Sequence, residues 1–168
     1  FYPLVENEHR DGMLYRSLAP VTDAAEELAE RAQEHALRVL EALDYVGVLA
    51  IEWFQDGGQL LANEMAPRVH NSGHWTIEGA TTSQFENHVR AVLGLPLGST
   101  KPTGFSAMFN LIGDAPPFAE VLALPAAKLH WYGKGPRPRR KVGHVTLVGP
   151  TAERRDELAA EWVRRFGA

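Results

Sequence analysis

The sequence contains no cysteine, which excludes a disulfide framework, a thiolate zinc site, an iron–sulfur cluster and a cysteine nucleophile. It also lacks an apolar run of the roughly 20 residues that a membrane span requires, and no signal-peptide pattern opens the chain. We therefore expect no membrane partner, and the missing thiols suit a protein of the reducing cytoplasm.

Positive charge is scarce as well: 17 Lys and Arg residues stand against 21 Asp and Glu residues, a net charge of −4 over 168 residues. This balance argues against a non-specific nucleic-acid binder, so we expect no nucleic-acid partner. The length suits one domain, or one domain with a small appendage, and 45% hydrophobic residues are ample for a core.

The predicted secondary structure mixes strands and helices, which indicates an α+β fold. Apolar and β-branched runs bounded by turn signals predict extended segments at 1–20, 46–54, 59–65, 106–112, 129–132 and 142–148. Helical spacing predicts helices at 23–43, where Asp23 and Glu26 form a capping box, at 83–93 and at 152–166. Residues 66–80 are predicted to form an irregular loop, and the Gly- and Pro-rich stretch 94–104 suggests two units, 1–98 and 99–168.

Two glutamates lie in the predicted hairpin of residues 46–65. Glu52 sits inside an apolar run, where an uncompensated charge is costly, and Glu64 ends the following run. If residues 56–58 form a three-residue loop, Glu52 faces Ala62 and shares one face of the sheet with Glu64, whereas a two-residue loop places them on opposite faces. Neighbouring carboxylates repel unless a cation lies between them, so the pair could hold Mg²⁺ or Mn²⁺. The alternative is an ordinary ion pair with Arg or Lys.

A polar loop follows this hairpin directly. Five hydrogen-bonding side chains fall within seven positions: Arg68, His70, Asn71, Ser72 and His74. Such groups suit a phosphoryl ligand, since Arg supplies a planar fork and Asn and Ser supply neutral partners. The same residues also suit a surface loop with capped turns, and both interpretations stay open. The spacing of the two histidines suggests zinc only on a helix, which Pro67 and Gly73 disfavour.

Positive charge gathers in one segment, residues 128–141, which contains no acidic residue. Its six cationic residues are Lys128, Lys134, Arg137, Arg139, Arg140 and Lys141. Gly and Pro residues exclude a helix there, and a rigid basic loop suits one or two phosphates. A solvated basic turn and an RNA-binding patch are the alternatives, although the neighbouring aromatic residues are not arranged as a stacking platform.

Six runs, spread over nearly the whole chain, carry a more specific pattern. They are ENEHRDG at 6–12, GVLAIE at 47–52, NEMAPRVHNSGHWT at 63–76, SQFE at 83–86, HWYGK at 130–134 and RKVGH at 140–144. Together they resemble the N5-carboxyaminoimidazole ribonucleotide synthetases, ATP-grasp enzymes of purine biosynthesis. The resemblance implies the C-terminal part of an ATP-grasp domain, an antiparallel sheet with helices, followed by a small, mostly β, C-terminal domain.

The resemblance also implies roles for individual residues in the acidic half of the chain. Glu52 and Glu64 would hold Mg²⁺, or Mn²⁺, that bridges the phosphates of ATP. His9 and Asn63, together with Glu64, would lie against the nucleotide.

Further roles follow for the polar loop and the basic segment. Arg68, His70 and Asn71 would line the place where bicarbonate meets the γ-phosphate. Lys134 and Arg140 would hold the 5′-phosphate of 5-aminoimidazole ribonucleotide. The family commonly has Gly where this chain has Arg139.

The implied reaction is ATP-dependent: bicarbonate is phosphorylated to carboxyphosphate, which delivers CO₂ to the exocyclic amine of 5-aminoimidazole ribonucleotide. Family members also have an N-terminal half with further nucleotide-binding elements, and they are commonly homodimers. We therefore expect a partial chain whose first residue, Phe1, is a cut edge, and which alone lacks ATPase activity.

Two other interpretations compete with this one. The chain could be a non-catalytic ligand-binding or dimerisation module on the same scaffold, although retention of both glutamates beside Arg68 favours an enzyme. It could also resemble another ATP-grasp ligase, such as the formate-using glycinamide ribonucleotide transformylase. The run HNSGHW at 70–75 speaks against that family.

Overall fold

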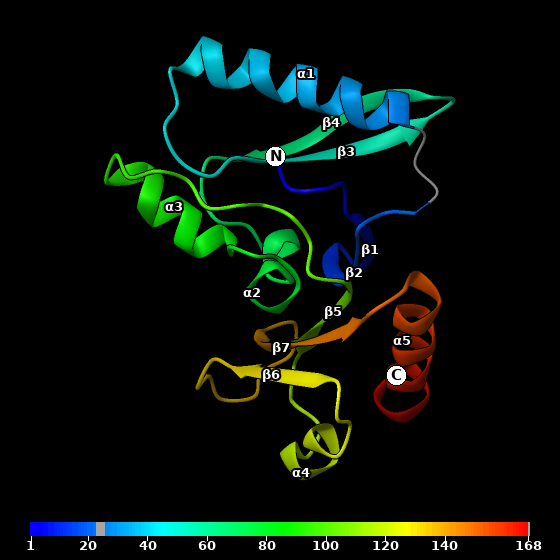
Figure 1. The fold of residues 1–168 in the computed structure, drawn as a ribbon. Helices are drawn as coiled ribbons and strands as arrows, with labels where there is room; N and C mark the ends of the chain where they lie inside the picture. Colours follow the sequence, from blue (N-terminus) through cyan, green and yellow to red (C-terminus); the bar gives the residue numbers. More distant parts are fainter. Residues whose placement is uncertain (23–25, 168) are drawn as a thin grey trace.

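The computed structural model describes residues 1–22 and 26–167, and it places the helices around two antiparallel sheets (Figure 1). Asp23 of the predicted capping box lies outside the described residues. In the described ranges, no helix is long and apolar enough to cross a membrane. The α+β class is confirmed.

The larger sheet has five strands in the order β1-β2-β5-β7-β6. Their bounds are β1 Glu6–Arg10, β2 Met13–Ala19, β5 Phe105–Ile112, β6 Ala127–Trp131 and β7 Lys141–Gly149. All neighbouring strands are antiparallel. The pairing of β2 with β5 joins the N-terminal strands β1 and β2 to the later strands β5, β7 and β6 in one sheet. Asp11 and Gly12 form the turn between β1 and β2, inside the segment 1–20 that was predicted to be extended.

The main core lies between this sheet and two helices, α4 (Phe118–Leu122) and α5 (Ala152–Phe166). Phe109 of β5 stacks on Trp162 of α5 with ring centroids 5.7 Å apart. A second apolar cluster, built around Trp75 and Met108, includes residues of β2 and of the segment after the hairpin. Apolar clusters therefore cover both faces of the sheet, and the second cluster holds the segment after the hairpin against it.

The smaller sheet is the predicted hairpin, formed by β3 (Ala50–Asp56) and β4 (Gln59–Ala66). Helix α1 (Glu26–Leu43) lies along it in Figure 1. Arg31 of α1 donates to the Gly58 carbonyl at 2.7 Å, and the rings of His35 and Trp53 lie 5.7 Å apart.

Three sequence predictions need correction. The strand predicted from Val46 begins only at Ala50, because Gly47 has a φ of 142° and the Val48 amide donates to His88 Nδ1 at 3.1 Å. The segment 66–80 is not wholly irregular: it contains the 3₁₀ helix η1 (Asn71–Gly73) and the short helix α2 (Thr76–Gly79). Helix α4, which follows two prolines, was not predicted.

The remaining helix, α3 (Gln84–Val92), confirms the prediction for residues 83–93. Ser83 begins it as N-cap, because its hydroxyl accepts from the Glu86 amide at 3.2 Å. Gly94 follows its end with a φ of 66°, the left-handed conformation that glycine adopts without steric cost.

Candidate functional site

The turn of the β3–β4 hairpin differs from the three-residue loop that the sequence suggested. Asp56 pairs with Gln59, so the loop contains only Gly57 and Gly58. Both have positive φ, 52° and 81°, as a tight two-residue hairpin turn requires. Glu52 consequently does not face Ala62, which pairs with Trp53 instead.

A β-bulge nevertheless places the two glutamates together. The register shifts between Glu52 and Trp53, so that Asn63 is the additional residue on β4 and Glu52 lies directly opposite Glu64. Residues opposite each other on paired strands project from the same face. The shared face is therefore confirmed. A two-residue loop alone would place the glutamates on opposite faces, and the additional residue of the bulge returns them to the same face.

Neutral and weakly basic groups surround the Glu52 carboxylate. Asn7 and Asn63 each donate a side-chain N–H to it at 3.4 Å, and His9 Nε2 lies 3.8 Å away. Its side chain is 10% exposed, against 53% for Glu64. In the described part of the chain, the basic side chains within 4 Å of the two carboxylates are imidazoles, so the alternative of an Arg or Lys ion pair is not realised.

His70 connects both carboxylates to the polar loop. Its Nε2 lies 3.1 Å from Glu64 Oε1, and its Nδ1 lies 3.9 Å from Glu52 Oε1. The Ser72 amide donates to Nδ1 at 3.3 Å, so Nδ1 is an acceptor and the proton of the neutral ring belongs on Nε2. His70 therefore donates to Glu64 and helps to fix its orientation.

Other residues of the polar loop lie beside this cluster. Asn71 begins η1, and its side-chain oxygen is buried with no hydrogen-bond partner among the described residues. Arg68 is exposed, and its guanidinium donates to the Val69 carbonyl at 3.0 Å. An unpaired amide oxygen and an exposed guanidinium leave hydrogen-bonding capacity for a ligand.

Gln84 was missed by the sequence analysis, although it stabilises the loop. Its side chain accepts from the His70 amide at 2.9 Å and donates to the His70 carbonyl at 2.7 Å. It also donates to His74 Nδ1 at 3.0 Å, so this nitrogen is an acceptor rather than a donor. The glutamine at the start of a predicted helix, inside the SQFE run, was the available signal.

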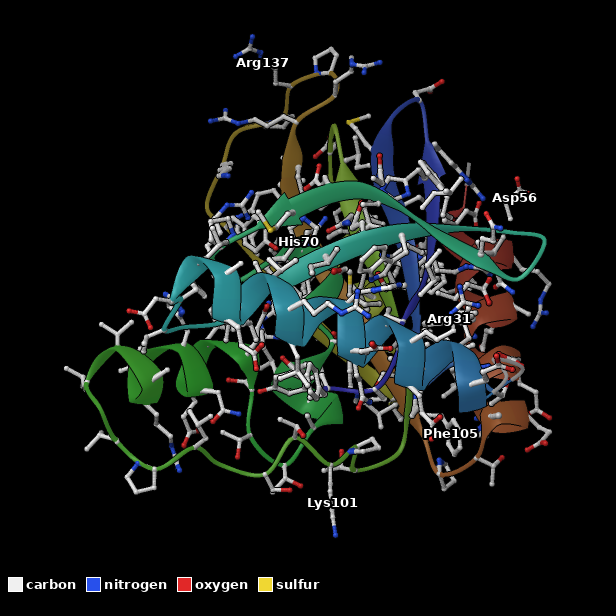
Figure 2. The ribbon with its side chains drawn as sticks, turned by 90° about the horizontal axis from the view of Figure 1, so that it is seen from above. Arg31, Asp56, His70, Lys101, Phe105 and Arg137 are labelled. Carbon is white, nitrogen blue, oxygen red and sulfur yellow. The ribbon has the colours of Figure 1, made fainter. Side chains whose placement is uncertain are left out.

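Four of the basic residues, Lys134, Arg137, Arg139 and Arg140, lie on the exposed loop 133–140, here called the basic loop. Figure 2 shows this loop projecting beyond the sheet at Arg137. Lys134 lies over the ring of Tyr132, 5.4 Å from its centroid, and Arg140 approaches the Gly135 carbonyl at 3.5 Å. Arg139 keeps a left-handed φ of 60°, the conformation that favours glycine, and donates to the Asp11 carbonyl at 3.0 Å.

Lys141, at the start of β7, is a further residue that the sequence analysis did not assign to the site. Burial, together with the positive charges of Lys134 and Arg68, lowers the pKa of its ammonium to about 8. Arg68 of the polar loop and Lys134 of the basic loop thus both lower the pKa of Lys141, although 66 residues of sequence separate Arg68 from Lys134.

Comparison with known proteins places the chain in a family. The family model "ATP-grasp domain" matches residues 1–85, just over half of the chain. The chain belongs to the ATP-grasp family. A second family model, the phosphoribosylaminoimidazole carboxylase C-terminal domain, matches residues 106–158.

Relatives of this ATP-grasp chain are named N5-carboxyaminoimidazole ribonucleotide synthase, which confirms the resemblance. The Pseudomonas aeruginosa protein is 59% identical over 147 residues, which are 88% of this chain and 40% of the relative. The Aquifex aeolicus protein is 47% identical over 157 residues, 91% of this chain and 42% of the relative.

Solved structures agree with the sequences. The N5-carboxyaminoimidazole ribonucleotide synthetase of Thermus thermophilus has a TM-score of 0.95 at 66% identity, over 98% of this chain and 46% of that structure. The Aspergillus clavatus synthase, in complex with ADP and 5-aminoimidazole ribonucleotide, has a TM-score of 0.90 at 35% identity, over 98% and 47%. The chain thus spans less than half the length of these relatives.

Proposed function

We propose that this chain supplies the carboxylates and the basic loop of a ligase that carboxylates 5-aminoimidazole ribonucleotide with ATP and bicarbonate, in purine biosynthesis. The observation that carries the proposal is the direct pairing of Glu52 with Glu64, next to a loop rich in hydrogen-bond donors. The relatives' names, and the Aspergillus clavatus complex with ADP and 5-aminoimidazole ribonucleotide, support this choice of substrates.

The carboxylates suit Mg²⁺ or Mn²⁺. Among the described residues, no group of three or more His, Asp and Glu residues could hold a metal ion unaided. Mg²⁺ does not need such a group, because it is commonly bound by one or two carboxylates together with waters and substrate phosphates. Glu52 and Glu64 would hold the ion, and Asn63 and His9 would lie against the nucleotide. When bound, the ion would neutralise phosphate charge during transfer.

The polar loop would position bicarbonate. We assign Arg68, His70 and Asn71 to this place because their donors and acceptors follow the carboxylates directly in the structure. An oxygen of bicarbonate attacks the γ-phosphorus of ATP, the bond to the ADP oxygen breaks, and carboxyphosphate forms. Positioning of both reactants, rather than covalent chemistry by the protein, supplies most of the rate enhancement in such transfers.

The basic loop would hold the nucleotide that receives CO₂. Lys134 and Arg140 would bind its 5′-phosphate, with Lys141 close by. Carboxyphosphate releases phosphate and CO₂, the exocyclic amine adds to the carbon, and loss of a proton gives the N5-carbamate. Exclusion of water matters here, because carboxyphosphate hydrolyses easily.

Several further properties belong to the same proposal. The enzyme would act in the cytoplasm as a homodimer, together with an N-terminal half that corresponds to the part of the relatives this chain does not match. Residues 1–98 would form the end of the ATP-grasp domain and residues 99–168 a small C-terminal domain, joined through the pairing of β2 with β5.

The test is ADP release by the full-length gene product, measured with and without bicarbonate and 5-aminoimidazole ribonucleotide. We expect release to require both, with one N5-carboxyaminoimidazole ribonucleotide formed per ADP. Nucleotide binding without turnover would instead indicate the non-catalytic module. Turnover with formate in place of bicarbonate would contradict the assigned reaction.

A further inference from the structure

The hydroxyl of the half-buried Tyr132 lies at the base of the basic loop. It lies 2.7 Å from Nδ1 of His144, on β7. Burial raises the pKa of Tyr132 to about 12, and burial together with the neighbouring His130 lowers the pKa of His144 to about 3. The phenol is therefore protonated and the imidazole neutral, so Tyr132 donates and His144 accepts.

His144 is itself held by two neighbouring imidazoles; His74, His130 and His144 are here called the histidine cluster. The rings of His144 and His130 stack with centroids 4.3 Å apart and planes 9° apart, and His74 lies 5.1 Å away. His130 Nε2 contacts the Glu78 carboxylate of α2 at 2.6 Å. Through Glu78 and His74, the residue that holds Tyr132 is fixed to the segment that follows the carboxylate hairpin.

Tyr132 also contacts the basic loop on its other side. Its ring faces the ammonium of Lys134, with 5.4 Å between Nζ and the ring centroid, an arrangement typical of a cation–π interaction. Its backbone N–H donates to the Val142 carbonyl at 3.0 Å, which closes the base of the loop. One side chain thus joins an exposed lysine to the buried His144 of the histidine cluster.

From these contacts, and resting on the proposed function, we propose that Tyr132 is a positioning residue for the basic loop. Its hydrogen bond to His144 holds the aromatic ring beneath Lys134, which places the lysine ammonium for the 5′-phosphate of the substrate. Loss of the hydroxyl should weaken binding of the phosphorylated substrate and leave the transfer from ATP unchanged.

The experiment is Tyr132→Phe in the full-length gene product, which keeps the ring and removes the hydroxyl. We expect KM for 5-aminoimidazole ribonucleotide to rise about fivefold, the effect of one ordinary hydrogen bond, with kcat and KM for ATP within about twofold of wild type. Thr146→Val is the matched control: it removes a buried hydroxyl two residues from His144 that has no partner in the described structure, and its KM values should not change.

A double-mutant cycle separates positioning from general stability. Tyr132→Phe and His144→Phe break the same hydrogen bond. The double variant should therefore have the same KM for 5-aminoimidazole ribonucleotide as the single variant with the higher KM. Additive effects would overturn the proposal, as would an unchanged KM in Tyr132→Phe while Lys134→Ala raises it. A lower kcat with both KM values unchanged would overturn it too, because it would show only a smaller fraction of folded enzyme and thus a merely structural hydroxyl. Failure of the wild-type protein to form product would instead reject the proposed function.

Discussion

The Glu52 carboxylate of the hairpin and the histidine cluster are held in opposite ways. Around Glu52, the amide and imidazole contacts are long, from 3.4 to 3.9 Å, and all come from groups without a fixed positive charge. In and around the histidine cluster, contacts are short: 2.6 Å from His130 to Glu78 and 2.7 Å from Tyr132 to His144.

This difference indicates a division of labour. Long contacts to neutral donors orient a carboxylate but leave much of its charge uncompensated, as a site awaiting a cation requires. The short contacts of Tyr132 with His144 and of His130 with Glu78 fix the orientation of these side chains, and they suit a rigid support. The hairpin would bind, whereas the cluster would hold the parts that bind in place.

The largest expected effect is on catalysis. Glu64→Gln keeps the size of the side chain and removes the charge that would face the ion, so ATP turnover by the full-length gene product should fall on the order of 100-fold. Glu120→Gln on exposed helix α4 is the matched control and should retain turnover. Near-normal turnover in Glu64→Gln would refute its role as a metal ligand.

The histidine cluster should make stability depend on pH. Burial lowers the pKa of His74 to about 4 and of His144 to about 3. Unfolded imidazoles take up protons as the pH falls below about 6.5, while the folded ones stay neutral, so acid favours the unfolded state. Between pH 7 and pH 5, the free energy of unfolding should decline by up to about 2 kcal/mol per histidine.

Denaturant unfolding at several pH values measures this dependence. His144→Phe should make it shallower, because one of the two depressed imidazoles is then absent. Equal stability of the wild-type protein at pH 7 and pH 5 would contradict the lowered pKa values of His74 and His144.

Gln84 connects the two regions, and its removal should have an intermediate effect. Gln84→Ala leaves the buried amide and carbonyl of His70 without their partners, which should lower the free energy of unfolding by about 1–3 kcal/mol. Thermal or denaturant unfolding measures the loss.

Asn63→Ala is the control for Gln84→Ala, since it also removes a side-chain amide. Asn63 is exposed and makes one contact at 3.4 Å, so its removal should change the free energy of unfolding by less than about 0.5 kcal/mol. If both variants lowered the free energy of unfolding equally, the contacts of the hairpin and those beside the histidine cluster would contribute equally to stability, against the proposed division of labour.

The sequence predicted most elements because local signals were strong. The closing helix was predicted at 152–166 and observed as α5, Ala152–Phe166, since its apolar periodicity and the Thr151 N-cap agree. The strand predicted from Val46 failed because the tertiary contact of Val48 with His88 replaces strand pairing there. Periodicity carries no information about such a contact.

The site shows the same limit. The sequence pattern placed Glu52 and Glu64 on one hairpin, but the bulge at Asn63 is not encoded in the spacing of turn residues. Lys141 and Gln84 act through burial and through partners distant in sequence, so their importance emerges only when the chain is folded. The assigned roles of Arg68, Lys134 and Arg140 remain predictions.

Manganese binding tests the central claim most directly, because Mn²⁺ replaces Mg²⁺ at oxygen ligands and the free ion is detected by electron paramagnetic resonance. The full-length gene product is titrated with Mn²⁺ in the presence of ADP, beside Glu52→Gln, Glu64→Gln and the control Glu120→Gln. The account predicts that either hairpin variant weakens binding about 10-fold or more, while the control binds as the wild type does. Unchanged Mn²⁺ affinity in both hairpin variants would contradict it.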